Sequence, residues 1–219
     1  IILAGSSYEA AGSTRAMAAE LEAYTEAGGA VVSITRHRLP GDTVLVENRA
    51  GAMELARRLA ALGHRRFGVL SGPKRLTTNR DRLSGIAAGL AELGSPLDPK
   101  LVFYGDFDRD GGYEAATQLI RSNKRPTCVL AANDAMALGA LAAFREAGIS
   151  VPGDMSLTGF GDIPAARDSV PSLSTVHLPL DELGAAAMRL ALRSDRETGP
   201  KKVGITGEVV LRESTAAPA

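Results

Sequence analysis

Short runs rich in valine, isoleucine and leucine alternate along the chain with longer runs of helical period. Strands are predicted at 1–4, 31–35, 44–47, 67–70, 101–104, 129–131, 156–159, 175–177 and 209–212. Helices are predicted between them at 13–27, 50–62, 79–93, 111–121, 134–147 and 180–192. Strands that are separated by crossover helices favour a parallel sheet covered on both faces, which is the doubly wound α/β class.

The charge and cysteine content exclude several classes of protein. The 219 residues include 25 basic and 25 acidic side chains, so the chain has no bulk electrostatic attraction for nucleic acid. A single cysteine, Cys128, excludes an internal disulfide and a cysteine-based zinc site, and its apolar neighbours predict burial. No apolar run is long enough to span a bilayer and no signal peptide is visible, so a cytoplasmic protein without membrane contact is expected.

Two segments near the carboxyl end are predicted to lack regular structure. The stretch "SDRETGPKK" at 194–202 has the composition of a surface loop. The final residues, "TAAPA", are expected to be frayed.

Polar residues follow many of the predicted strands, at the edge where parallel α/β sheets bind ligands. They are Ser6-Ser7, Thr35-Arg36, the loop "SGPKRLTTNR", Asp106-Phe107, Asn133-Asp134 and Asp162. Each one alone is better explained as a helix cap or a turn residue. Together they favour a binding site.

Motifs that would indicate catalysis are missing. There is no glycine-rich phosphate loop and no G-x-S-x-G sequence. The histidines His37, His64 and His177 are far apart and lack metal-ligand spacing. His64 is expected to lie on the surface or to cap a helix, whereas His177 could approach a cleft or pack in the core. No catalytic residue, metal or cofactor is predicted, which favours binding over turnover.

Six segments together resemble the lactose-repressor (LacI) family of bacterial transcription regulators. They are "LGHRRFGVLSGP" (62–73), "NRDRLSGIAAGL" (79–90), "YGDFDRDGGYEAATQLI" (104–120), the long segment 125–166 that contains "ANDAMALGAL", "PSLSTVHLPLDELGAAAM" (171–188) and "VVLRESTA" (209–216). The resemblance implies a type I periplasmic-binding-protein fold, in which crossover strands join two Rossmann-like subdomains with parallel sheets and the effector binds between them.

The resemblance also implies how the chain is divided. Residues 1–45 with 179–206 would form the N-terminal subdomain, and residues 46–178 with 207–219 the C-terminal subdomain. The N-terminal subdomain is expected to be incomplete, because "IILAG" resembles a later strand of it. The family's helix-turn-helix headpiece is not found in the sequence, so operator DNA would be bound only through that missing part.

The family's ligand-binding positions map onto several residues here. Arg80 would pair with sugar hydroxyls, Phe107 would pack on the face of the ligand, and Asn133 would bind a hydroxyl. Ser6 and Arg36, at ends of the N-terminal strands, complete the predicted set together with Asp162. Asp134 is expected to cap the following helix.

The chain departs from the family pattern at three positions. The usual aspartate of the "GFGD" turn is Gly161, followed by Asp162. A family glutamine is replaced by Leu178 and a family aspartate by Thr35. The binding cleft is therefore expected to be less polar than that of a typical sugar repressor.

The leading functional prediction is the ligand-sensing core of a regulator, in which a sugar controls DNA binding by a homodimer. The alternative is the periplasmic sugar-binding protein of a transporter, and an enzyme is disfavoured because no nucleophile, base or metal set is present. The apolar stripe Leu180, Leu183, Ala187 and Leu190 could form the dimer contact or be buried within its own subdomain.

Overall fold

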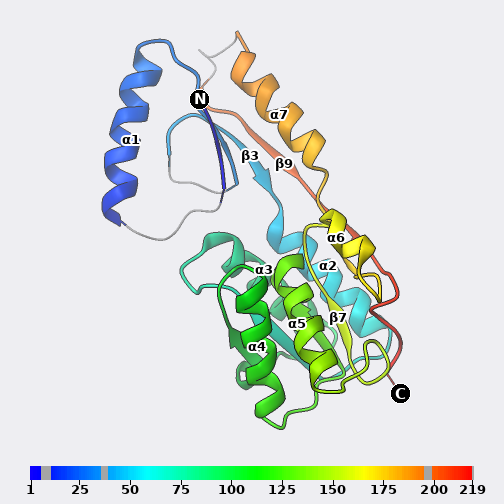
Figure 1. The fold of residues 1–219 in the computed structure, drawn as a ribbon. Coiled ribbons are helices and arrows are strands. Elements are labelled where there is room, and N and C mark those ends of the chain that lie inside the picture. The colour runs from blue at the N-terminus through cyan, green and yellow to red at the C-terminus, as the bar shows by residue number, and fades with distance from the viewer. Residues whose placement is uncertain (6–10, 36–38, 195–198, 219) are drawn as a thin grey trace. The chain divides into compact units, whose positions relative to one another are not determined.

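The computed structural model describes residues 1–5, 11–35, 39–194 and 199–218 (Figure 1). Its strands are β1 (Ile2–Ala4), β2 (Val32–Ile34), β3 (Asp42–Val46), β4 (Phe67–Ser71), β5 (Val102–Tyr104), β6 (Cys128–Ala131), β7 (Ser156–Thr158), β8 (Thr175–His177), β9 (Lys202–Ile205) and β10 (Glu208–Val210). Its helices are α1 (Ala11–Glu26), α2 (Asn48–Ala61), α3 (Thr77–Glu92), α4 (Arg109–Arg121), α5 (Asp134–Glu146), α6 (Pro164–Asp168) and α7 (Leu180–Leu192), with a short 3-10 helix η1 (Pro99–Leu101). The predicted α/β class with parallel sheets is confirmed.

The chain divides into two compact units, each built from separate segments. Unit 1 contains Ile1–Glu47, Arg75–Thr78 and Pro179–Thr206, and unit 2 contains Asn48–Lys74, Asn79–Leu178 and Gly207–Ala219.

Unit 1 contains a four-stranded parallel sheet in the order β1-β2-β3-β9. The strand β9 lies at the end of the predicted loop 194–202 and was not expected, because its sequence "KVGI" is short and contains lysine and glycine. The helix α7 packs on this sheet through Leu183, Ala187 and Leu190, which are all buried. Most of the apolar stripe considered for a dimer contact is therefore internal, and of its four residues only Leu180 is exposed.

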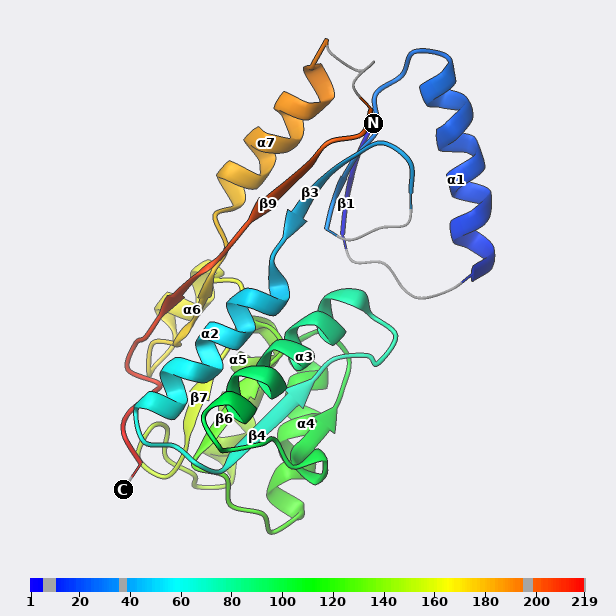
Figure 2. The ribbon, with the colours of Figure 1, turned by 180° about the vertical axis from the view of Figure 1, so that it is seen from behind.

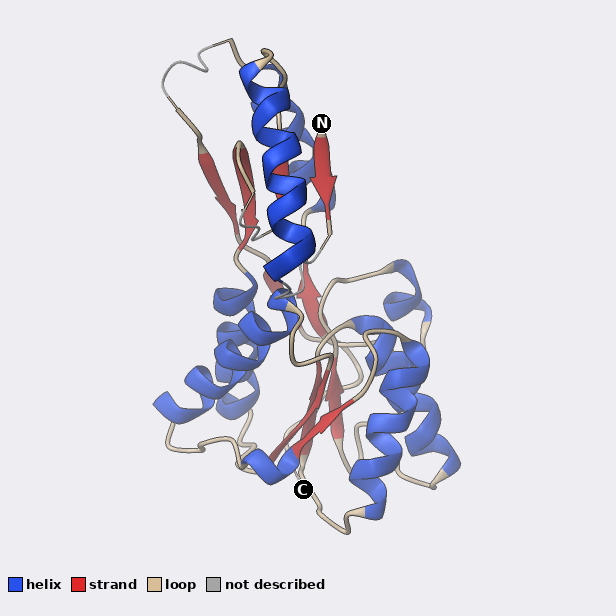
Figure 3. Ribbon diagram, turned by 90° about the vertical axis from the view of Figure 1, so that its left-hand side faces the viewer, coloured by secondary structure: helices blue, strands red, loops and turns tan. Residues whose placement is uncertain are grey.

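Unit 2 contains a second parallel sheet, in the order β5-β4-β6-β7, beside the antiparallel pair β8 and β10. Successive side chains of a strand point to opposite faces. Val69 and Leu130 accordingly belong to a core shared with α2 and α3, whereas Leu70 and Val129 belong to a core shared with α4 and α5. Figure 2 shows α2 and α3 on one side of the strands, and Figure 3 shows helices on both sides of this sheet.

Two helix pairs in unit 2 pack closely because glycine lies at their contacts. A Cβ atom on Gly139 of α5 would collide with the carbonyl oxygen of Arg109, and one on Gly112 of α4 would collide with that of Met136. Figure 1 shows α4 and α5 side by side. Gly85 and Gly89 of α3 make the same kind of contact with backbone carbonyls of α2. These contacts fix the helices that carry residues of the candidate site.

The end of the chain is held in unit 2, contrary to the prediction of a frayed tail. The backbone of Ser214 is bonded to β7, since Leu157 N donates to Ser214 O at 2.9 Å, and Ser214 is fully buried. Ala216 N donates to Ser156 Oγ at 3.1 Å. A tail with these backbone bonds is ordered through Ala216.

The prediction that His64 is a surface or capping residue is also wrong. Its side chain is only 1% exposed, and the two ring nitrogens lie 2.9 Å from Thr127 Oγ1 and 2.9 Å from Ala216 O. Because a carbonyl oxygen only accepts, Nε2 donates to Ala216 and Nδ1 accepts from Thr127. Burial lowers the pKa of His64, with the bond to Ala216 acting in the opposite direction. His64 therefore anchors the tail as a neutral ring.

Candidate functional site

The carboxyl ends of β5, β4, β6 and β7 meet at one edge of the unit-2 sheet, because these four strands run parallel. The segments that follow them carry Gly72, Phe107, Asn133 and the turn 159–162. β6 and β7 are neighbours in this sheet, so Asn133 and Asp162 follow adjacent strands as predicted.

Asn133 links two of these segments. It is the N-cap of α5, where its Oδ1 accepts from Met136 N at 2.7 Å. Its Nδ2 donates to Phe107 O at 3.0 Å, so the same side chain holds the loop after β5. Asn133, and not Asp134, is therefore the residue that caps the helix.

Asp134 has a different role from the one predicted. Its side chain is buried, and it accepts from Thr175 Oγ1 at 2.6 Å and from Ile163 N at 2.9 Å. Burial raises the pKa of Asp134, and the hydrogen bonds from Thr175 and Ile163 lower it in part. The carboxylate thus ties the start of α5 to β8 and to the turn after β7.

Asp162 lies at the centre of a charged cluster. Its backbone is left-handed, with φ of 61°, and its side chain is only 3% exposed. It accepts from Arg212 Nη2 at 2.7 Å, Arg167 Nη2 at 2.8 Å and His177 Nδ1 at 3.0 Å. Burial alone raises the pKa of Asp162, but the bonds from Arg167 and Arg212 outweigh this effect and the pKa falls to about 2. Both carboxylate oxygens are therefore engaged within unit 2.

The two arginines at the start of α3 differ sharply in environment. Arg80, the residue mapped from the family, is exposed on α3. Arg82 is only 7% exposed and donates through Nε to Asn48 Oδ1 at 2.8 Å and through Nη1 to Ala132 O at 2.6 Å. The buried residues Arg82, Ile86 and Leu90 are spaced by four, so the helical period could have identified Arg82 as the inward arginine.

Arg82 lies against two aromatic rings. Its guanidinium carbon is 3.8 Å from the ring centroid of Phe160, which belongs to the turn after β7, and 5.8 Å from that of Phe107. Burial lowers the pKa of Arg82 to about 9, opposed by the charge of Asp134. At neutral pH the side chain remains charged, and contact with ring faces stabilises a desolvated guanidinium by about 2 kcal/mol.

The ring of Phe107 packs against Gly72, which has no side chain. A Cβ atom on Gly72 would collide with the Phe107 ring. The Gly72 segment is itself held by Asn79, whose Oδ1 accepts from Gly72 N at 2.8 Å and whose Nδ2 donates to Gly72 O at 3.0 Å. The ring of Phe107 is partly buried beside Arg82, and ligand contact by this ring stays a prediction.

The other predicted site residues are placed as follows. Ser6 and Arg36 lie outside the described residues. Thr35 belongs to unit 1, where its backbone φ is 81°. Gly161 has a φ of 138°, and a Cβ atom there would lie 3.2 Å from Asp134 Oδ2. An aspartate at position 161 would therefore be strained and would face another carboxylate.

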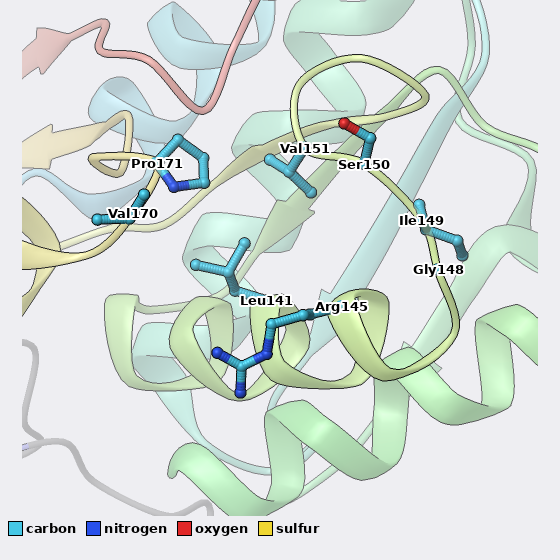
Figure 4. A pocket seen from close by; sticks show the side chains of 8 residues that line it. All are labelled: Leu141, Arg145, Gly148, Ile149, Ser150, Val151, Val170 and Pro171. Atoms are coloured by element: carbon cyan, nitrogen blue, oxygen red, sulfur yellow. The ribbon is translucent and has the colours of Figure 1, made fainter.

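A pocket of about 270 Å³ lies elsewhere in unit 2, between the second half of α5 and two loops (Figure 4). It is lined by Leu141, Arg145, Gly148, Ile149, Ser150, Val151, Val170 and Pro171. Binding pockets for small molecules usually measure about 300–1,000 Å³, so this one is small for an effector. Val170 beside it is 91% exposed.

The described part of the chain holds no group of three or more His, Cys, Asp or Glu side chains that could bind a metal ion. Among the helices of the same residues, none has the length and apolar character needed to cross a membrane.

Comparison with known proteins gives consistent matches. A family model described as a periplasmic binding protein-like domain matches residues 56–215. The HTH-type transcriptional regulator DegA of Bacillus subtilis (strain 168) is 34% identical over 189 residues, which cover 85% of this chain and 56% of DegA. The chain thus spans about half the length of this relative.

Solved structures of regulators superpose on most of the chain. A transcriptional regulator CelR–cellobiose complex has a TM-score of 0.84 and 29% identity, covering 98% of this chain and 65% of CelR. A LacI family transcriptional regulator from Enterococcus faecium with bound ribose has a TM-score of 0.80 and 25% identity, covering 90% of this chain and 75% of its own.

Proposed function

This chain belongs to the periplasmic binding protein-like domain family, as an effector-binding core of the LacI type, and we propose that it senses a sugar or sugar derivative and thereby controls DNA binding by a helix-turn-helix headpiece outside these residues. The proteins that it resembles are transcriptional regulators rather than enzymes, as the lack of catalytic motifs predicted. The similar structures with cellobiose and ribose support a carbohydrate ligand and a cytoplasmic regulator over a transporter component.

The observation that supports binding at the carboxyl edge of the unit-2 sheet is the pairing of Arg82 with Phe107. A buried guanidinium lies 5.8 Å from the centroid of a partly buried aromatic ring, and both follow or face strand ends where α/β sheets bind ligands. We assign ligand contact to Arg82 and Phe107. Asn133 holds the Phe107 loop, and Asp162 holds the turn that carries Phe160.

Phe107→Ala is expected to lower affinity for a bound sugar about tenfold, because an aromatic contact contributes about 0.5–1.5 kcal/mol beyond its buried area. A thermal-shift screen with ribose, cellobiose and other sugars identifies the ligand, and calorimetry then measures the variants. Phe107→Tyr retains the ring and should bind within about threefold of the parent chain. If Phe107→Ala folds normally and binds with unchanged affinity, the ring is not at the site.

We also propose that the chain forms a homodimer through the surface around the pocket of Figure 4. Val170 is 91% exposed and lines the pocket together with Leu141, Ile149 and Val151, so a two-fold axis through this surface would bury both valines in one apolar contact. Arg145 at the pocket and the exposed Asp168 beside the valine provide opposite charges for the same arrangement.

Val170→Glu is expected to convert the dimer to monomer, since it places a charge in an apolar contact. Sedimentation velocity at tens of micromolar measures the change. Leu192→Glu is the matched control, because Leu192 is 75% exposed on α7, and it should leave the dimer intact. The opposite pattern would assign the contact to α7, and a parent chain that is monomeric at this concentration would refute the proposal.

A further inference from the structure

Arg82 is a buried charge whose donors are only partly used. Of its five N–H groups, one on Nε and one on Nη1 have acceptors, Asn48 Oδ1 and Ala132 O. Both acceptors are uncharged. Within residues 1–5, 11–35, 39–194 and 199–218, no carboxylate forms an ion pair with Arg82, and no acceptor binds its Nη2. The charge of Asp134 acts on Arg82 without an ion pair between them. Buried charges in proteins are normally paired directly, so the arrangement leaves room for a counter-charge.

The ring of Phe160 determines which donors remain. The guanidinium carbon lies 3.8 Å from the ring centroid, so the ring covers one side of the fork while Nε and Nη1 are fixed by hydrogen bonds. The remaining donors, including both on Nη2, are held in one orientation. A planar fork held this way binds two oxygens of a carboxylate or phosphate at once.

Most polar side chains at this edge of the sheet already bond within unit 2. The oxygens of Asp134 and Asp162 accept from side chains and backbone of their own unit. The Oδ1 of Asn133 caps α5, and the Oδ1 of Asn79 accepts from Ser71 Oγ and Gly72 N. Among the buried side-chain acceptors in the described part of unit 2, only Thr158 Oγ1 at the end of β7 lacks a partner. This edge therefore offers a ligand more donors, from Arg82, than acceptors.

The balance of free donors and free acceptors at this edge favours one kind of ligand over another. A sugar hydroxyl both donates and accepts, so an array of hydroxyls needs acceptors from the protein, and a buried donor without one is costly. An oxyanion only accepts. Resting on the proposed effector function, we propose that the effector carries an oxyanion, a carboxylate or a phosphate, and that the remaining donors of Arg82 bind it over the Phe160 ring.

The carboxylate of Asp106 provides a way to distinguish a neutral sugar from an oxyanion. It precedes Phe107, its side chain is exposed, and none of its oxygens accepts a hydrogen bond within the described chain. A neutral sugar would use this carboxylate as an acceptor, so Asp106→Asn would weaken its binding. An oxyanion would be repelled by the same carboxylate, so Asp106→Asn would leave its affinity unchanged or raise it.

The test compares matched ligands on the full chain by calorimetry and thermal shift. The panel is ribose with ribose 5-phosphate, glucose with glucose 6-phosphate and glucuronate, and inorganic phosphate alone. We expect at least one charged member to bind at least tenfold more tightly than its neutral parent, with an affinity that falls as salt rises. The phosphate esters, glucuronate and inorganic phosphate distinguish the two sources of oxyanion.

Substitutions of Arg82 test whether this residue binds the charged group of the ligand. Arg82→Met should lower the affinity for the charged ligand about tenfold to a hundredfold, and Arg82→Lys should lower it less, because the charge remains without the fork. Arg58→Met, a surface arginine of α2, is the matched control and should bind within about twofold. Circular dichroism checks that each variant is folded. If Arg82→Met does not fold, the comparison is made with Arg82→Lys.

The outcomes separate this inference from the proposed function. A neutral sugar that binds as tightly as its charged derivative overturns the oxyanion and leaves the sugar-sensing function standing. Charged ligands that bind equally well to Arg82→Met and Arg82→Lys overturn the assignment to Arg82. If no charged member binds, the inference is wrong, and if the neutral sugars also fail, the proposed carbohydrate ligand fails with it.

Discussion

Arg193→Met is expected to destabilise the native state by about 3–5 kcal/mol, because it removes the bidentate guanidinium from a buried carboxylate that also accepts from Lys201 N. Arg193 donates through Nε to Asp42 Oδ2 at 2.8 Å and through Nη2 to Asp42 Oδ1 at 2.9 Å. The two side chains are only 11% and 8% exposed. This bidentate pair joins the end of α7 to the start of β3, so its loss affects the sheet of unit 1.

Urea unfolding followed by circular dichroism measures the change. The matched control is Arg58→Met, which breaks a pair with Glu54 whose side chains are 62% and 44% exposed. An exposed pair of this kind contributes about 0–1 kcal/mol, so the control should remain close to the parent chain. Equal stabilities for the two variants would show that the Asp42 pair is not buried in solution.

Asp134→Ala is expected to cost about 2–5 kcal/mol. The substitution leaves the Thr175 hydroxyl and the Ile163 N–H without their acceptor, and each buried donor left unpaired costs about 1–3 kcal/mol. The turn 159–162 would keep only the backbone bond from Asp134 N to Phe160 O at 3.3 Å as its link to the start of α5, because the bond from Ile163 N is lost. Phe160, which lies against Arg82, belongs to this turn. We therefore expect the variant to lose both stability and ligand affinity.

Thermal unfolding and calorimetry of the same variant test the two effects. Asp134→Asn is the matched control, because its remaining oxygen preserves one of the two bonds and its volume is unchanged. It should recover part of the lost stability. A stable Asp134→Ala variant with normal affinity would contradict the role of this carboxylate in positioning the turn.

The strands and helices were predictable wherever a regular period covers a whole element. The helix at 180–192 and the strand at 175–177 have the predicted bounds, and the other predicted elements differ by one or two residues at an end. The strand β9 was missed because it has only four residues and two of them, Lys202 and Gly204, are of types that are uncommon in strands. A hydrophobic period shows which face of an element is buried, and it needs several residues to be visible. A strand as short as β9 is identified only by its pairing with β3 in the structure.

The errors concern contacts between residues far apart in the chain. His64 is buried because Ala216 returns to it across 152 positions, and Asp134 is buried because Thr175 and Ile163 meet it. Neither partner is visible in the local sequence. The sequence did place Phe107 and Asn133 at one sheet edge, since strand ends of a parallel sheet converge. The mapping of ligand contact to Arg80 stays a prediction, and the arginine that α3 buries is Arg82.

The docked tail has a consequence for the order in which the protein is made. Synthesis proceeds from the amino end, and folding of a domain during synthesis requires that its interior be complete. The interior of unit 2 includes Ser214, and the bond to His64 comes from Ala216. A ribosome that has translated as far as α7 has therefore released most of unit 2 but not the residues that close it. Unit 2 stays unfinished until residues 207–216 emerge, and until then β8 lacks its partner strand β10 and Leu157 N of β7 lacks its acceptor, Ser214 O.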